Sequence, residues 1–263
     1  LKNVIMWGGV SLLIINPVFA EDIDWKGGID VSGNATYSGT KLEVYDNIKF
    51  HTYGTAPDGL GAGYSGVEEG NTYAWVVTNN SLTANENVEI VNTVKDNTNN
   101  EVGNNRAIYA KYGAKIDFTV SDNIYLASVF KHTSWADSIA ITAKGGNSEV
   151  KISGKTVQII GSVDVSSRLD NDNFYGNNVT LELTGKDSFW YGSAIGESVY
   201  TTPESEVRKN WVDVTLKDGA SWIYHRRDRL DNLTLDNGVV ILDDDIIAST
   251  YANTEIILTE EEK

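Results

Sequence analysis

The chain has 263 residues, no cysteine, and 37 acidic against 21 basic side chains, which gives a net charge of −16. This length is ample for one large domain, and the lack of cysteine excludes disulfides, thiol chemistry and cysteine-based metal sites. A negative field of this size disfavours nucleic acid and anionic membrane surfaces as partners. Glycine is frequent and proline rare, a balance that favours strands joined by tight turns.

Residues 1–20 have the pattern of a secretory signal peptide. Lys2 supplies an early positive charge, and the mostly apolar run from Val4 to Ile15 is too short to span a bilayer comfortably. The small residues at 18 and 20 predict cleavage after Ala20, so that the exported chain begins at Glu21. A buried N-terminal strand is the alternative for this segment.

Residues 21–105 read as an irregular β region with many turns. Residues 58–70 are glycine-rich and predict an exposed loop, and residues 92–105 predict a second, polar loop. Residues 61–66 match G-x-G-x-x-G, but no predicted strand leads in and no helix follows, so the dinucleotide-binding interpretation fails. Short strands are expected at 28–31, 41–45, 48–53, 73–77 and 88–91.

Residues 106–178 show a rhythm of short apolar segments and glycines. Strands of three to five residues with turns between them fit the three-sided coil of a parallel β-helix. Residues 170–178 predict a polar loop, and no stretch has a convincing helical period. The strands are expected at 107–110, 113–118, 125–128, 138–143, 149–152, 157–160 and 163–165.

The clearest repeat lies between residues 179 and 242. Val179–Leu183 and Val212–Leu216 both alternate apolar and polar residues and lie 33 positions apart. Such alternation predicts strands with one buried face, and two copies at a fixed offset predict units that stack on each other.

An aromatic segment follows each copy, at 188–191 and at 221–224. If the offset of 33 continues through these segments, Phe189 stacks on Trp222 and Tyr191 stacks on Tyr224.

Together these patterns predict an all-β fold, a right-handed parallel β-helix over 106–258 with loop insertions, followed by a charged tail at 259–263. The segment 192–210 is expected to leave the coil and to project as a binding element. The alternative is a β-sandwich, in which Asp236-Asn237-Gly238 closes a hairpin. Later strands are expected within 230–235, at 239–242 and at 255–258.

The order of elements from Val214 to Trp222 and from Leu230 to Gly238 resembles the late coils of pertactin-like autotransporter passengers. Both show a strand, a glycine turn, Ser-Trp, a short polar loop, Leu-x-Leu and an Asn-Gly turn. The segment 225–229, His-Arg-Arg-Asp-Arg, departs from the small turn that is usual in that family. The resemblance is strongest over 179–242, fainter over 106–165 and slight before 106.

This resemblance implies a chain exported to the cell surface or the medium of a Gram-negative bacterium. It implies an adhesin or structural stalk without catalysis, for which a host surface or a glycan is the ligand. The missing cysteines suit a chain that crosses an outer membrane unfolded. The translocator barrel of that family has roughly a dozen strands of about ten residues each, for which 263 residues leave no room. The expectation is therefore a passenger without its outer-membrane barrel.

No residue is assigned to catalysis, to a cofactor or to a metal. His51, His132 and His225 lack metal-ligand spacing. The basic segment 225–229 reads as a solvated corner or a ligand-contacting loop, and 243–245 offers three aspartates that match neither an EF-hand loop nor the glycine-rich calcium repeat.

The tryptophans of the exported chain are expected either to pack between coils or to stack on sugars, and for Trp222 packing is expected. A β-helical polysaccharide-degrading enzyme, a lyase or a hydrolase, is the alternative function, and it would need carboxylates clustered with Arg or Lys on one coil face. The tryptophans are Trp25, Trp75, Trp135, Trp190, Trp211 and Trp222.

Overall fold

A computed structural model describes much of the chain between residues 22 and 258, and every regular element in that part is a β-strand. Within the described residues no helical segment has the length and hydrophobicity that a bilayer crossing requires. The predicted signal peptide at 1–20 lies outside them. The described residues are 22–25, 29–32, 35–38, 41–44, 48–54, 57–62, 72–78, 81–94, 106–130, 139–165, 176–196, 210–224, 230–242 and 256–258.

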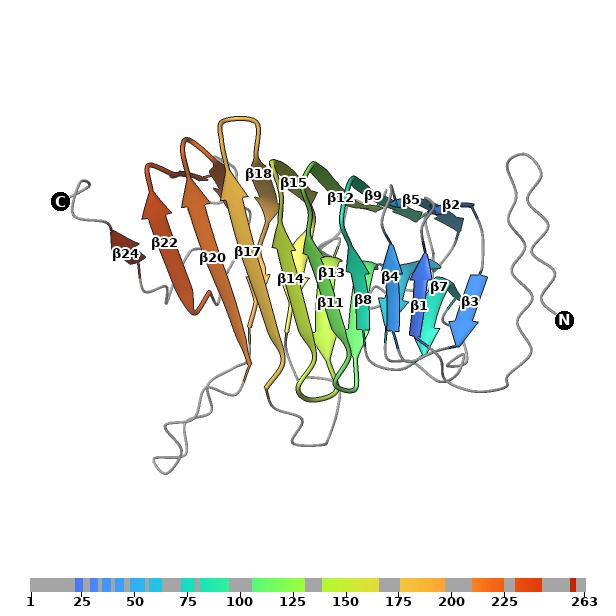
Figure 1. The fold of residues 1–263 in the computed structure, drawn as a ribbon. Helices are drawn as coiled ribbons and strands as arrows, with labels where there is room; N and C mark the ends of the chain where they lie inside the picture. Colours follow the sequence, from blue (N-terminus) through green and yellow to red (C-terminus); the bar gives the residue numbers. More distant parts are fainter. Residues whose placement is uncertain are drawn as a thin grey trace, which may run out of the picture.

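Three sheets, here named A, B and C, contain all the described strands, and every ladder that joins neighbouring strands is parallel (Figure 1). Sheet A has nine strands. In spatial order they are β1 (Asp22–Trp25), β4 (Lys41–Val44), β8 (Ser81–Ala84), β11 (Lys115–Thr119), β14 (Glu149–Ser153), β17 (Asn178–Thr184), β20 (Trp211–Lys217), β22 (Asn232–Asp236) and β24 (Ile256–Leu258).

Sheet B has eight strands and sheet C has seven. Sheet B runs β2 (Ile29–Ser32), β5 (Ile48–Gly54), β9 (Val88–Val94), β12 (Asn123–Phe130), β15 (Thr156–Ile160), β18 (Phe189–Gly192), β21 (Ser221–Tyr224) and β23 (Val239–Leu242). Sheet C runs β19 (Ala194–Ile195), β16 (Ser162–Asp164), β13 (Ile139–Lys144), β10 (Arg106–Lys111), β6 (Pro57–Ala62), β7 (Thr72–Thr78) and β3 (Ala35–Ser38).

From β8 to β21 successive strands visit sheets A, B and C in turn, so each strand pairs with the one three places along the chain. A set of three successive strands, one from each sheet, is called a coil below. The strands of residues 22–94 belong to the same three sheets as those after residue 106. β22 and β23 lie in different sheets, so Asp236-Asn237-Gly238 does not close a hairpin. The all-β, parallel architecture differs from an antiparallel sandwich.

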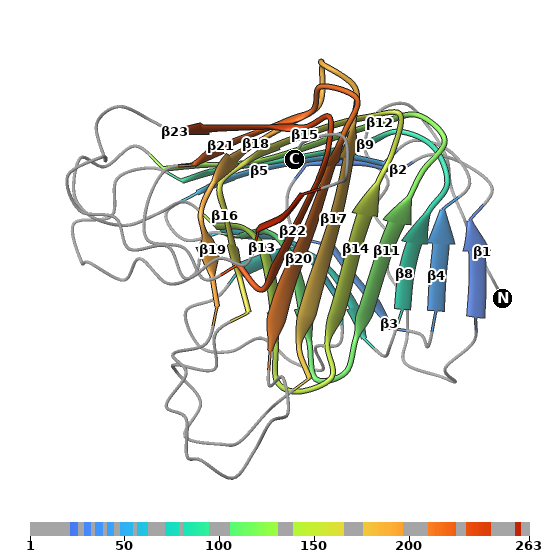
Figure 2. The ribbon, with the colours of Figure 1, turned by 90° about the vertical axis from the view of Figure 1, so that its left-hand side faces the viewer.

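The three sheets surround a common interior (Figure 2), and buried side chains from all three form one hydrophobic core. β17 and β20 each bury every second side chain, as the alternating sequence predicts. Val179 pairs with Val212, and Leu181 pairs with Val214, in a ladder seven residues long with an offset of 33. Because the offset is constant, the buried side chains of one strand lie on those of the next, and each fully buried Val or Leu contributes about 1.5–3 kcal/mol.

The predicted stacking of the aromatic segments is wrong by one residue. Phe189 pairs with Ser221, Trp190 with Trp222, and Tyr191 with Ile223. The turn between β17 and β18 holds four residues, 185–188, whereas the turn between β20 and β21 holds three, 218–220. The extra residue changes the offset from 33 in sheet A to 32 in sheet B, and a shift of one reverses which side chains face the core.

The corrected register places two tryptophans face to face inside the core. The rings of Trp190 and Trp222 stack with centroids 5.0 Å apart and planes 6° apart. Trp190 Nε1 donates to the carbonyl of Gly161 at 3.0 Å, and Trp222 Nε1 donates to that of Gly192 at 3.0 Å. A Cβ on Gly192 would lie 2.3 Å from the Gly161 carbonyl oxygen, so the close approach of the two backbones requires glycine.

Several expected boundaries are also wrong. β6 (Pro57–Ala62) occupies the start of the predicted loop 58–70, and β19 (Ala194–Ile195) lies within the predicted insertion 192–210. β6 has little intrinsic strand propensity, but β7 and β10 pair with it on either side, so tertiary context overrides local preference. β9 continues to Val94, three residues into the predicted loop 92–105. The strands at 22–25, 35–38 and 81–84 had no counterpart in the prediction.

Candidate functional site: the outward faces of the three sheets

The outward face of sheet A is charged. Glu149 pairs with Lys115 at 3.4 Å and with Lys151 at 2.9 Å, and Glu182 pairs with Lys217 at 2.8 Å. Burial raises the pKa of Glu149, but hydrogen bonds and charge from Lys151 and Lys115 outweigh it and hold this pKa below its ordinary value. The lysine side chains of these pairs are 35–63% exposed, so water screens each pair and it contributes about 0–1 kcal/mol. This pattern is typical of a solvated face.

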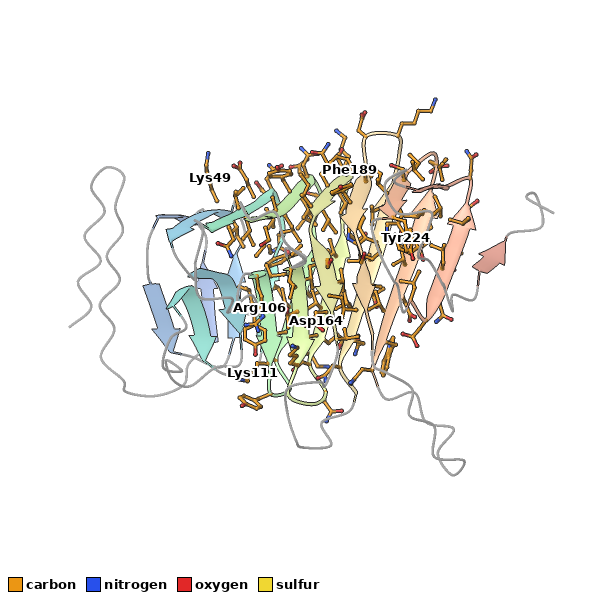
Figure 3. The ribbon with its side chains drawn as sticks, turned by 180° about the vertical axis from the view of Figure 1, so that it is seen from behind. Lys49, Arg106, Lys111, Asp164, Phe189 and Tyr224 are labelled. Carbon is orange, nitrogen blue, oxygen red and sulfur yellow. The ribbon has the colours of Figure 1, made fainter. Side chains whose placement is uncertain are left out.

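Sheet C carries a buried charged cluster, defined here as Arg106, Lys111, Lys144 and Asp164, and Figure 3 labels Arg106, Lys111 and Asp164. Each of these four residues is less than 9% exposed. Lys144 Nζ lies 2.9 Å from a carboxylate oxygen of Asp164. The ring of Tyr109 has the Arg106 guanidinium 4.3 Å and the Lys111 ammonium 5.9 Å from its centroid.

Strand register brings this cluster together. Tyr109 pairs with Thr142, which pairs with Asp164, and Lys111 pairs with Lys144. Breaking a buried ion pair by removing one partner is strongly destabilising, because the remaining charge is left uncompensated. Asp164 is the one carboxylate on β10, β13 and β16, whereas glycoside hydrolysis by the usual routes uses two.

A buried polar ladder lines the corner that precedes sheet A. Asn210 Oδ1 accepts from Asn177 N and Asn177 Nδ2, both at 3.0 Å. Asn177 Oδ1 in turn accepts from Gly146 N at 2.9 Å and from Ser148 N at 3.3 Å. Ser148 Oγ then accepts from Gly113 N at 3.1 Å. Each side chain satisfies backbone donors of the preceding coil, so the ladder has a structural role.

The outward face of sheet B, here called the sheet B face, is aromatic and aliphatic. The inward side chains of its strands belong to the core, including Ile124, Leu126 and Trp190, so the alternate residues point outward. Two rows of paired residues follow from the register. The first is Glu89, Tyr125, Gln158, Phe189, Ser221 and Val239, and the second is Val91, Ala127, Ile160, Tyr191, Ile223 and Ile241.

Most of these outward side chains are half-buried or exposed, and Phe189 projects from the outer side of the stack (Figure 3). Gln158 Nε2 donates to the carbonyl of Asp187 at 3.0 Å, which orients its carboxamide. Sequence reasoning missed this face because the register in sheet B was not known. Once the register is known, the sequence marks this face by Tyr125, Gln158 and Phe189, which occupy the same outward position in three consecutive coils.

The residues singled out from the sequence do not converge in the described structure. His51 lies on β5, Gly61 lies on β6, and Trp211 is half-buried on the outward face of sheet A. Trp25 and Trp75 lie on β1 and β7. His132, Trp135, the segment 225–229 and the aspartates at 243–245 lie outside the described residues. In the described part of the chain no three His, Cys, Asp or Glu side chains gather as metal ligands would.

Comparisons with protein-family models, with curated proteins and with solved structures found no match to this chain.

Proposed function

We propose that the chain is a right-handed parallel β-helix and the passenger of a pertactin-like autotransporter, exported to the bacterial surface, where it acts as an adhesin or stalk without catalysis. The observation that supports this most is the parallel ladder of Val179–Leu183 on Val212–Leu216, at one coil's offset. Both segments lie within 179–242, where the resemblance to such passengers is strongest. Parallel crossover connections are right-handed in about 98% of cases, which supports the proposed hand.

Three sequence features support the proposed export. Residues 1–20 have the pattern of a signal peptide. The chain has no cysteine and a net charge of −16, which suit secretion in an unfolded state and solubility afterwards. The proposed partner for display is an outer-membrane translocator barrel, and the proposed ligand is a host surface or a glycan.

Export and display can be tested with the chain fused to a translocator barrel. N-terminal sequencing of the exported protein is expected to begin at Glu21, and protease added to intact cells is expected to remove the passenger. A mature chain that retains Trp7, or a passenger that external protease cannot reach, would contradict the proposal. Circular dichroism of the purified protein should show strand signal with very little helix, and a helical spectrum would contradict the fold.

A polysaccharide-degrading enzyme is the second candidate, because the buried cluster places Lys144 against the Asp164 carboxylate, with Arg106 and Lys111 around Tyr109 two strands away. Assays on acidic and neutral polysaccharides separate the two functions. Reproducible cleavage that Asp164→Asn abolishes, without a loss of the folded state by circular dichroism, would favour the enzyme. No cleavage is expected from a passenger that acts by adhesion.

A further inference from the structure

The sheet B face is neutral in a strongly acidic chain. The charged positions of its outward register, Asp30, Lys49 and Glu89, lie on β2, β5 and β9 at the N-terminal end of the face, where Lys49 and Glu89 are 4.0 Å apart. From β12 to β23 its described outward side chains carry no formal charge. Val239 and Ile241 expose 47% and 45% of their surface. A contiguous apolar surface on an exported protein indicates an interaction site, and the outward face of sheet A offers no equivalent.

The shape of the sheet B face favours one extended polymer over a second protein. Five interstrand steps separate β9 from β23, a length of about 24 Å, and the two rows lie about 7 Å apart along each strand. Such a strip offers a few hundred Å², whereas a stable dimer buries about 800 Å² on each partner. An extended peptide would add to a sheet edge through its backbone, but the strands of this face already use their backbone groups in ladders.

The order of side chains along the first row suits a neutral glycan. Tyr125 and Phe189 lie two strands apart, about 9–10 Å, with Gln158 between them. An extended β-1,4-linked glycan presents the same ring face at every second sugar, a repeat close to this spacing. Its apolar C–H face can pack on the aromatic rings. The Gln158 carboxamide, which Asp187 orients, and the Ser221 hydroxyl can bond the hydroxyls of the sugar.

We propose that the sheet B face binds a neutral β-1,4-linked glycan that lies across the strands from β12 to β21. Sugar rings pack on Tyr125 and Phe189, Gln158 and Ser221 bond the intervening hydroxyls, and Tyr191 contacts the chain from the second row. This inference rests on the proposed adhesive role and adds to it a place on the fold and a ligand class.

The test measures binding by the purified exported chain, which does not depend on display at a cell surface. Native gels that contain hydroxyethylcellulose, a neutral β-1,4-glucan, should retard the wild type, and calorimetry with cellohexaose should give a matching affinity. Tyr125→Ala and Phe189→Ala should each weaken binding by roughly tenfold. Phe189→Tyr should retain binding. Trp211→Ala, which removes a half-buried aromatic from the outward face of sheet A, is the matched control and should bind as the wild type does.

Three results would overturn the proposal, provided that thermal melts show folded protein. These are the absence of retardation for the wild type, equal binding by Tyr125→Ala and Phe189→Ala, and a preference for polygalacturonate, which is acidic. Sedimentation that shows a dimer which Phe189→Ala dissociates would instead assign the face to a second copy. Each of these results leaves the tests of export and surface display unaffected, so a failure of this inference is distinguishable from a failure of the proposed function.

Discussion

At the scale of single residues, Trp222 combines a large buried aromatic surface with one buried hydrogen bond. It is 3% exposed, stacks on Trp190 and donates to the Gly192 carbonyl. Trp222→Ala should therefore lower the free energy of unfolding by about 3–5 kcal/mol, from lost transfer energy and the cavity that remains. Urea denaturation measures this change.

Trp211→Ala is the control for Trp222, because Trp211 is half-buried on the outward face of sheet A. Trp211→Ala should lower the free energy of unfolding by less than half of the amount expected for Trp222→Ala. An effect below about 0.5 kcal/mol for Trp222→Ala would be typical of a surface site, and it would contradict the stacked arrangement.

The Glu149 carboxylate makes the free energy of unfolding depend on pH, and its lowered pKa determines the direction of that dependence. Lys151 and Lys115 lower its pKa below the ordinary 4.5, against the effect of burial. The folded state therefore gains stability that is present above pH 4.5 and is lost as the pH falls through the lower, folded-state pKa. Glu149→Gln should cost up to about 1 kcal/mol at pH 7, with the difference from wild type disappearing in acid.

Equilibrium unfolding between pH 7 and pH 2.5 measures this difference. Glu86→Gln, at a half-buried position between β8 and β9, is the control and should stay within about 0.5 kcal/mol of wild type. A difference for Glu149→Gln that grows as the pH falls would have the wrong sign for a carboxylate stabilised by lysines.

At the scale of elements, the buried polar ladder of Asn210, Asn177 and Ser148 connects the corners of neighbouring coils through side-chain hydrogen bonds. Asn177→Ala removes the acceptor for the backbone N–H groups of Gly146 and Ser148, both in a tightly turned segment. Buried donors left without a partner cost about 1–3 kcal/mol. Hydrogen exchange of these two amides should accelerate, and the free energy of unfolding should fall by that amount.

Asn178→Ala is the matched control for the ladder, since Asn178 begins β17 one position later and makes only a long side-chain contact of 3.4 Å to Gly176. Its exchange pattern should stay close to that of the wild type. Equal acceleration in both variants would mean that the Asn177 side chain does not hold the corner.

The strands after residue 106 were largely predictable, because alternating side chains and glycines mark them directly. The offset of 33 between β17 and β20 was visible in the sequence and is confirmed. The stacking of Phe189 was not predictable, because a turn can absorb one residue without changing the pattern of either strand. β6 was missed because its pairing partners, and not its own residues, make it a strand.

The sheet faces were less predictable than the strands. Arg106, Lys111, Lys144 and Asp164 are spread over 59 positions of the sequence, and only the register of sheet C brings them together. The sheet B face likewise depends on which residues point outward in six different strands. Local sequence patterns predict which side of a strand is buried. A site on the outer side can be predicted only when the pairing of distant strands is known.

At the scale of the whole molecule, the coil from 178 to 210 should be removable as a unit. Its deletion joins Asn177 to Trp211, so that β20 replaces β17 on β14 in the same register. Trp222 then takes the place of Trp190 on Ile159, with Gly161 replacing Gly192 as its acceptor. Because such stacks are stabilised mainly between neighbours, this variant should fold with a cooperative transition and a smaller urea m value.

Deletion of 178–184 alone is the control, because it removes β17 from sheet A but keeps β18 and β19, so that sheets B and C retain a strand that sheet A has lost. It should fail to give a cooperative unfolding transition. Failure of the full-coil deletion, together with success of the partial one, would contradict stacking at the observed offset.

The parallel ladders also determine how this chain begins to fold. No strand from β8 to β21 finds a partner in its immediate neighbour in sequence, so no short hairpin can form first. A pair within β8 to β21 must close a loop of about thirty residues, and the described pairs with shorter offsets, such as β6 on β7 at 15 residues and β21 on β23 at 18, also close a loop; each closure costs chain entropy before any contact is gained. Each later coil then adds to an existing edge. Refolding should therefore show slow initiation and faster growth, and removing one coil should change its rate little.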